Sequence, residues 1–186
     1  MLFPSGTFTK GSRMKIAYTI ARGRGNTDLL LAKIADRLMA RGIRPIGAVQ
    51  INEDREDCPR CDMDLKVLPD GPVFRISQSL GRESRGCRLD PAALEMAVAE
   101  VGKGIAGGAD ILIINKFGKH EASGRGFRET IAEALSRDMP VLVGLNGMNE
   151  EAFMEFTGGV ASQVEAELEA VWQWASEATH TKVGSD

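Results

Sequence analysis

Apolar residues along the chain form two patterns, short continuous runs and longer stripes at helical spacing. The runs are typical of strands buried on both faces, and they are Lys15–Ile20, Pro45–Gln50, Ile111–Asn115 and Pro140–Asn146. The stripes predict helices, and they contain Leu30, Ile34 and Leu38; Leu94, Val98, Val101 and Ile105; Phe127, Ile131 and Leu135; and Val164, Leu168, Val171 and Ala175. Because the runs alternate with the stripes, the pattern predicts a three-layer α/β domain with a mostly parallel sheet.

Residues 63–80 interrupt this alternation. Two extended segments, MDLKVLP and VFRISQSL, flank the dipeptide Asp70-Gly71, which favours a tight hairpin turn. The sequence therefore predicts a β-hairpin inserted into the sheet. We expect residues 1–13 to be an irregular lead-in, residues 14–178 to form a single domain, and residues 179–186 to be a polar tail.

Composition and charge narrow the class of protein. A chain of 186 residues suits one domain, and its net charge of -3 argues against general nucleic-acid binding. No apolar run approaches the roughly 20 residues that would cross a bilayer, so we expect no membrane span. The N-terminal residues lack the apolar segment of a secretory signal. With three cysteines, these features indicate a cytoplasmic protein.

A glycine-rich turn follows the first predicted strand and resembles the phosphate-cradling pattern G-x-x-x-x-G-K-[ST]. Gly25 and Thr27 match its second glycine and its hydroxyl, whereas Ile20 replaces the first glycine and Asn26 replaces the lysine. Backbone N–H groups in such a turn can bind an anion at a helix N-terminus. The residues expected to do so are Arg22, Gly23, Arg24, Gly25, Asn26 and Thr27. The same pattern also fits a strand-to-helix turn without a ligand.

The central predicted strand ends in Asn115 and Lys116, where proteins of the P-loop kind carry an acid that holds magnesium or orients water. Cations follow in the loops after the strands, namely Arg82, Arg85, Arg88, Lys116, Lys119, Arg125 and Arg128. Since the carboxyl ends of parallel strands share one rim, several of these side chains should converge there. Like charges in contact repel by about 1 kcal/mol per pair even in water, so a bound anion would stabilise the set. Alternatively, long basic side chains simply solvate the loops.

The same region also contains an incomplete guanine-reading motif. Asn115-Lys116 begins like the N-K-x-D of GTPases, but Gly118 stands in the fourth position, so the acid that contacts the base is missing.

The cysteines and histidines give weaker evidence for a functional site. Cys58 and Cys61 form one C-x-x-C, and Cys87 follows the hairpin, so three thiolates with His120 or Asp62 could hold zinc. A redox-active pair and plain reduced cysteines remain open as alternatives. Two pairs at zinc-ribbon spacing would indicate a zinc site strongly, and only one pair is present.

Three long segments, CDMDLKVLPDG, RISQSLGRESRGCRLDPAALE and ADILIINKFGKHEASGRGFRETIAEAL, resemble the bacterial family domain of unknown function 2478. The resemblance covers Met14 to about Gly159. It implies a three-layer fold like that of small P-loop nucleoside triphosphatases of the thermophile type. It also implies a more distant relation to the P-loop protein of molybdopterin-guanine dinucleotide synthesis, and an association with molybdenum uptake or molybdoenzyme genes.

The functional hypothesis follows from the positions at which this chain differs from the triphosphatase relatives. Those relatives carry a P-loop lysine and an Asp-Glu pair, whereas this chain has Asn26 and Asn115-Lys116. Without these groups, transition-state stabilisation should fall by several kcal/mol. We therefore expect a degenerate P-loop that binds a nucleotide, phosphate or molybdate-like oxyanion without magnesium, with Lys116 neutralising the anion and Arg85 and Arg88 closing over it.

Two alternatives remain open. One is a nucleoside triphosphatase or nucleotide-dependent transferase with rearranged groups, in which Glu121 would supply the carboxylate. The other is a regulatory module whose basic rim meets an acidic protein partner.

Overall fold

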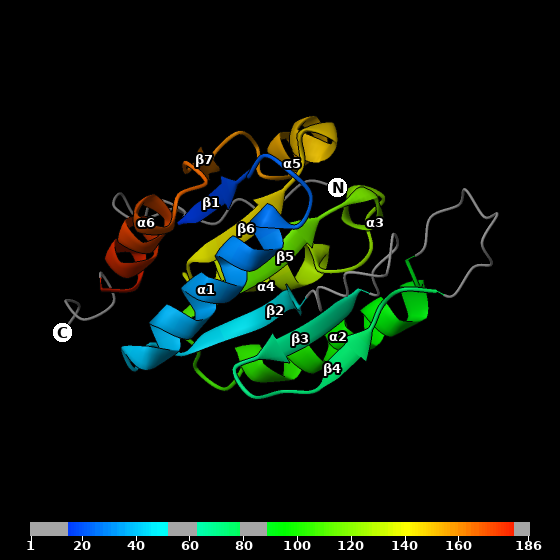
Figure 1. The fold of residues 1–186 in the computed structure, drawn as a ribbon, viewed down its shortest axis with the longest axis horizontal. Coiled ribbons are helices and arrows are strands. Elements are labelled where there is room, and N and C mark those ends of the chain that lie inside the picture. The colour runs from blue at the N-terminus through cyan, green and yellow to red at the C-terminus, as the bar shows by residue number, and fades with distance from the viewer. Residues whose placement is uncertain (1–14, 52–62, 79–88, 181–186) are drawn as a thin grey trace.

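The computed structural model describes residues 15–51, 63–78 and 89–180 of the chain. Its centre is a seven-stranded sheet with the order β4-β3-β2-β5-β6-β1-β7 (Figure 1). The strands are β1 Ile16–Thr19, β2 Pro45–Ile51, β3 Asp64–Leu68, β4 Val73–Arg75, β5 Ile111–Phe117, β6 Val141–Leu145 and β7 Ser162–Gln163. The five strands from β2 to β7 in that order pair in parallel, which confirms the predicted α/β fold with a mostly parallel sheet.

Helices cover both faces of this sheet, as the layers in Figure 1 show. They are α1 Asn26–Ala40, α2 Pro91–Ile105, α3 Lys119–Ala122, α4 Arg128–Ser136, α5 Glu150–Phe156 and α6 Leu168–His180, with a 3-10 turn at Gly147–Asn149. Side chains of α1 and α6 pack on one face, and those of α2, α4 and α5 pack on the other. Because both faces are covered, the central strands are continuously apolar rather than alternating.

The hairpin formed by β3 and β4 extends the sheet beyond β2 by antiparallel pairing. It lies within the segment that the Asp70-Gly71 turn predicted, and Figure 1 places it at the edge farthest from β7. The hairpin therefore lies far along the sheet from the end of β1.

Two short elements differ from the sequence-based prediction. Val164 was expected on the last helix, but its N–H donates to the Tyr18 carbonyl at 2.9 Å, next to the edge strand β7. Helix α6 begins at Leu168 and runs to His180, two residues into the predicted tail. The loop expected after β5 contains α3.

The carboxyl ends of β5, β6 and β1 lie side by side at one end of the strands, and the turn from β1 into α1 starts there (Figure 1).

None of the helices in the described residues has an apolar stretch of the length needed to span a membrane.

Candidate functional site

The turn between β1 and α1, residues 20–25, has the six-residue length of the G-x-x-x-x-G pattern. Gly23 and Gly25 adopt left-handed φ angles of 89° and 78°, which only glycine adopts without strain. The N–H of Ala21 donates to Thr27 Oγ1 at 3.1 Å, and Asn26 Nδ2 donates to the Arg22 carbonyl at 2.6 Å. Asn26, which replaces the lysine of the pattern, and Thr27, which matches its hydroxyl, therefore bond to the turn and fix its conformation.

This turn still has backbone N–H groups that can donate hydrogen bonds to a ligand. Within the part of the chain that the structure describes, no acceptor binds the N–H groups of Gly23, Arg24 or Gly25. Arg22 and Arg24 are exposed, and neither pairs with a described carboxylate. The turn thus offers free backbone donors and two guanidinium groups at the positive end of α1.

Asn115 connects three segments at the end of β5. The side chain is buried, its Oδ1 accepts a hydrogen bond from the Gln50 N–H at 2.8 Å, and its Nδ2 donates to Asp28 Oδ1 at 2.9 Å. An amide can do both because it has a donor and an acceptor. An ionised aspartate in the same place would face the carboxylate of Asp28 and repel it.

Asp28 is the site residue that the sequence analysis missed. It follows Thr27 in the first turn of α1, and its contact with Asn115 places a carboxylate beside the end of the central strand. The carboxylate at this place therefore comes from α1 and not from β5. The sequence signal was an acidic residue directly after the matched hydroxyl position.

Lys116 and Lys119 are both exposed, beyond the buried amide of Asn115. A Cβ built on Gly118 would lie 3.9 Å from Lys116 Cε, so the lysine side chain extends along the loop that leaves β5. Among the described residues, neither lysine pairs with a carboxylate. Lys116 directly follows Asn115 in the sequence, and no contact in the described residues joins its side chain to the turn or to Asp28.

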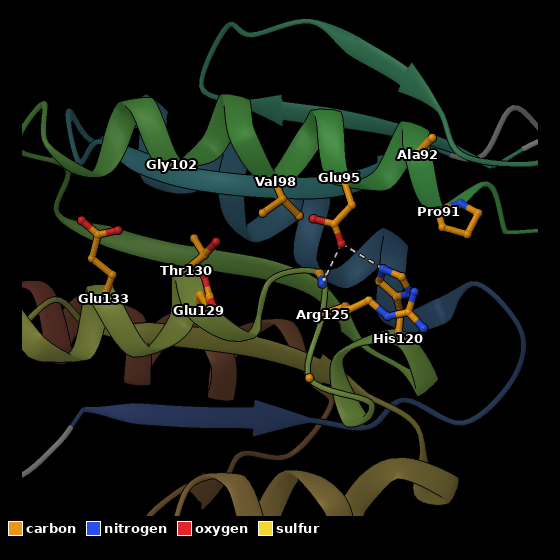
Figure 2. Close-up of a pocket in the computed structure, with 12 residues that line it drawn as sticks. Pro91, Ala92, Glu95, Val98, Gly102, His120, Arg125, Glu129, Thr130 and Glu133 are labelled. Atoms are coloured by element: carbon orange, nitrogen blue, oxygen red, sulfur yellow. Dashed lines mark hydrogen bonds and ion pairs between the residues drawn. The ribbon is translucent and has the colours of Figure 1, made fainter. Parts of the chain in front are cut away.

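Arg125 and Arg128 contact parts of the molecule other than the turn between β1 and α1. Arg125 lines a groove between α2 and the α3–α4 segment, where Glu95 accepts hydrogen bonds from the Gly126 N–H and contacts His120 Nε2, each at 2.9 Å (Figure 2). The Arg128 guanidinium stacks on Phe156 of α5, 4.4 Å from the ring centroid. No contact in the described residues joins either arginine to the turn.

Glu121, the proposed catalytic carboxylate, is buried and holds the loop after β5. Its Oε2 accepts a hydrogen bond from the Gly118 N–H at 2.9 Å, and its Oε1 accepts one from the Phe127 N–H at 3.4 Å. Gly126 approaches the same carboxylate so closely that a Cβ there would overlap it. This arrangement gives Glu121 a structural role as the cap of α3.

Other predicted residues fall outside the described parts of the chain. These are Arg85 and Arg88 of the expected lid and the cysteines Cys58, Cys61 and Cys87. In the described ranges, no group of three or more His, Cys, Asp or Glu residues is arranged to hold a metal ion. His120 contacts Glu95 instead.

Thr19 lies at the end of β1, directly before the turn. Its side chain is fully buried, and its hydroxyl has no hydrogen-bond partner among the described residues. It pairs in register with Gly144 of β6, where a Cβ would lie 3.0 Å from the Thr27 methyl group. The strand ends and the start of α1 are therefore tightly packed beneath the turn.

The sheet order and the strand-to-helix turn define an α/β protein whose fold is like that of P-loop nucleoside triphosphatases. More narrowly, the chain belongs to the family described as protein of unknown function, DUF2478, which it matches over residues 16–174.

Two further similarities extend this assignment. The chain is 35% identical over 161 residues to the molybdenum import ATP-binding protein ModC 2 of Bradyrhizobium diazoefficiens, covering 86% of this chain but only 18% of that protein. It also resembles the solution structure of a human cancer-related nucleoside triphosphatase, with a TM-score of 0.59 and 14% identity, over 92% of this chain and 100% of that one. The second likeness concerns the fold alone.

Proposed function

We propose that this protein binds an anionic ligand, a nucleotide or a small oxyanion, at the turn between β1 and α1. The observation that carries this proposal is the set of unoccupied N–H groups of Gly23, Arg24 and Gly25 beside two exposed arginines. Backbone N–H groups at a helix N-terminus bind phosphate, and guanidinium groups pair with its oxygens in two parallel bonds.

Binding in this proposal does not depend on a divalent cation. The strand position that would hold magnesium is the neutral amide of Asn115, which is already engaged by Gln50 and Asp28. Positive charge comes instead from Arg22, Arg24 and Lys116, and charge-assisted hydrogen bonds from such groups are about twice as strong as neutral ones.

A link to molybdenum metabolism is a further part of the proposal. Its support is the name of the relative, a molybdenum import ATP-binding protein, of which the matching segment is a minor part. Molybdate therefore belongs among the anions to be tested, beside nucleotides and phosphate.

Titration calorimetry tests the proposal with ATP, GTP, phosphate and molybdate, each with and without magnesium. We expect at least one of them to bind equally well in both conditions. Arg24→Ala should weaken that binding about tenfold, because a hydrogen bond to a charged group contributes about 1.5 kcal/mol or more. Lys116→Ala should weaken it less, since a compact ammonium makes no bidentate contact.

The matched control is Arg137→Ala. Arg137 is exposed at the carboxyl end of α4 and bonds Glu133 at 2.9 Å, and no described contact joins it to the turn, so its loss removes the same charge elsewhere. Absence of binding by all four anions, or equal weakening by Arg24→Ala and Arg137→Ala, would contradict the proposal.

One observation favours a second function, hydrolysis of a nucleoside triphosphate. Asp28 places a carboxylate in the first turn of α1 at the end of β5, and carboxylate oxygens are ligands that magnesium prefers. This function predicts magnesium-dependent phosphate release that Asp28→Asn abolishes. Glu121→Gln should instead lower stability, because Glu121 caps α3. Phosphate release equal to that of a protein-free sample would rule out hydrolysis.

A further inference from the structure

A cavity of about 350 Å³ lies beside the turn, between α1 and the segment that leads into α6. Its size is at the lower end of the range for small-molecule pockets, which begins at roughly 300 Å³. Arg22 and Asn26 of the turn line one end, and Lys33 of α1 lines it further along the helix. Because Arg22 belongs to both the turn and the cavity, the two are continuous.

The walls of this cavity are partly apolar. Leu29 of α1 is 49% exposed and Leu168 at the start of α6 is 37% exposed, and both line it. A single exposed leucine is ordinary, but here two from different elements face the same space. Such a pair provides a surface on which a flat, weakly polar group can rest.

The basic side chains at the cavity have no acidic partner among the described residues, unlike Arg37 further along the interface between α1 and α6. Arg22 and Lys33 pair with no carboxylate in the described residues. One helical turn beyond Lys33, Arg37 bonds Glu169 of α6 at 2.6 Å and stacks on Trp172 with its guanidinium 4.4 Å from the ring centroid. The bond from Arg37 holds the pKa of Glu169 below its usual value. Arg22 and Lys33, at the cavity, have no such carboxylate partner among the described residues.

The sheet order places the cavity and the Asn115–Asp28 pair on opposite sides of the turn. Strand β7 flanks β1 on the side of the cavity, and β6 followed by β5 flanks it on the other (Figure 1). A ligand whose phosphate groups lie on the turn can therefore extend toward the cavity without displacing the buried amide.

We propose that the cavity holds the base and ribose of a nucleotide whose phosphate groups bind the turn. The inference rests on the proposed function and makes it more specific. The base lies against Leu29 and Leu168, Arg22 contacts the phosphates where turn and cavity meet, and Lys33 donates to an acceptor on the base or the ribose. Phosphate or molybdate would leave the cavity empty, so a nucleotide is the ligand that fits both parts.

Calorimetry on the full chain separates the two parts of the site. Tripolyphosphate probes the turn alone, whereas ATP and GTP probe the turn and the cavity together. We expect the better of the two nucleotides to bind about tenfold tighter than tripolyphosphate, because it buries apolar area on the leucines. The double substitution Leu29→Ser with Leu168→Ser should remove this difference and leave tripolyphosphate binding unchanged.

Val73→Ser in β4 is the control, since Val73 is 51% exposed and lies at the opposite edge of the sheet. Thermal melting followed by circular dichroism checks that each variant is folded. Tripolyphosphate binding as tight as nucleotide binding, or a double variant that still binds nucleotide tenfold tighter, would overturn the inference while the proposed function stands. Failure of tripolyphosphate and both nucleotides to bind would overturn the nucleotide function itself.

Discussion

Asn115 shows how one neutral side chain can satisfy two polar neighbours at a strand end. Its amide donates to a carboxylate and accepts from a backbone N–H, so both neighbours are satisfied at neutral pH. The buried position carries no net charge of its own. Because burying an unpaired charge is costly, the neutral amide is favourable at this buried position.

Replacing Asn115 with aspartate tests this interpretation. Asn115→Asp removes the bond to Asp28 and sets two carboxylates against each other in a buried place. We expect the free energy of unfolding to fall by about 2 to 3 kcal/mol at neutral pH, measured by urea denaturation. The loss should shrink as the pH is lowered and one carboxylate takes up a proton.

The reciprocal exchange is the control for that experiment. With Asp28→Asn added to Asn115→Asp, the carboxylate on the strand can accept from the Gln50 N–H and from the new amide on α1. The double variant should regain most of the lost stability, which a double-mutant cycle measures as a favourable coupling. Additive losses would show that the contact does not determine the stability of this rim.

Thr19 gives a second prediction at the scale of a single residue. Its hydroxyl is buried and has no partner among the described residues, so Thr19→Val replaces an unsatisfied polar group with a methyl group of similar size. We expect the free energy of unfolding to rise by about 1 kcal/mol. The comparison is Thr179→Val, because the Thr179 hydroxyl bonds the Ala175 carbonyl at 3.0 Å and its removal should destabilise α6. A less stable Thr19→Val variant would indicate that the hydroxyl has a partner.

At the scale of elements, Tyr18 attaches the strand that leads to the turn to helix α5. The side chain is buried, and its hydroxyl donates to Glu150 Oε1 at 2.8 Å. Burial and, after it, the bond to Glu150 raise the pKa of Tyr18 above its usual value of 10.0. The protonated form is therefore favoured by folding. Its stabilising contribution is present below the unfolded pKa and is lost as the pH rises through the folded pKa.

An absorbance titration measures this directly, because Tyr18 is the one tyrosine in the chain. The phenolate should form at a higher pH in the folded protein than in urea. Glu150→Gln should lower the midpoint but leave it above the unfolded value, since burial is the larger cause. A midpoint equal to that in urea would mean that the β1–α5 contact is open in solution.

Elements were predictable from the sequence where local pattern and tertiary environment agree. The runs that form β1, β2, β5 and β6 are covered on both faces, and continuous apolar character is the signal of such strands. Strand β7 has two residues, both exposed, so it exists through pairing with β1 and leaves no periodic signal. Helix α3 is one turn long and depends on Glu121, which accepts from the N–H groups of Gly118 and Phe127 on either side of the helix and leaves no periodic signal.

The position of the turn between β1 and α1 was predictable from the sequence, but the contacts around it were not. Motif spacing identified the turn because the matched residues, Gly25 and Thr27, lie in one short segment directly after a predicted strand. The contact between Asn115 and Asp28 joins residues 87 positions apart, and nothing local to either one indicates it. Arg125 and Arg128 were grouped with the rim by sequence proximity, yet the chain turns between them toward Glu95 and toward Phe156.

At the scale of the whole molecule, the site is a small positive region on a protein with a net charge of -3. The long-range field of such a protein does not attract an anion, so in the proposed function only the charges at the turn hold the ligand once it is close. Salt should therefore change the dissociation rate constant more than the association rate constant. It screens the contacts made by Arg22, Arg24 and Lys116, and these contacts set the rate of dissociation.

Stopped-flow binding of a fluorescent nucleotide at increasing salt tests this prediction. Between low and physiological ionic strength, where the Debye length shortens to about 8 Å, we expect the dissociation rate to rise several-fold and the association rate to change little. Arg24→Ala should flatten the salt dependence of dissociation, whereas Arg137→Ala should preserve it. A steep fall of the association rate with salt would mean that an extended positive surface steers the ligand. The ligand would then be recognised by a wider basic rim, rather than by the turn and its two arginines.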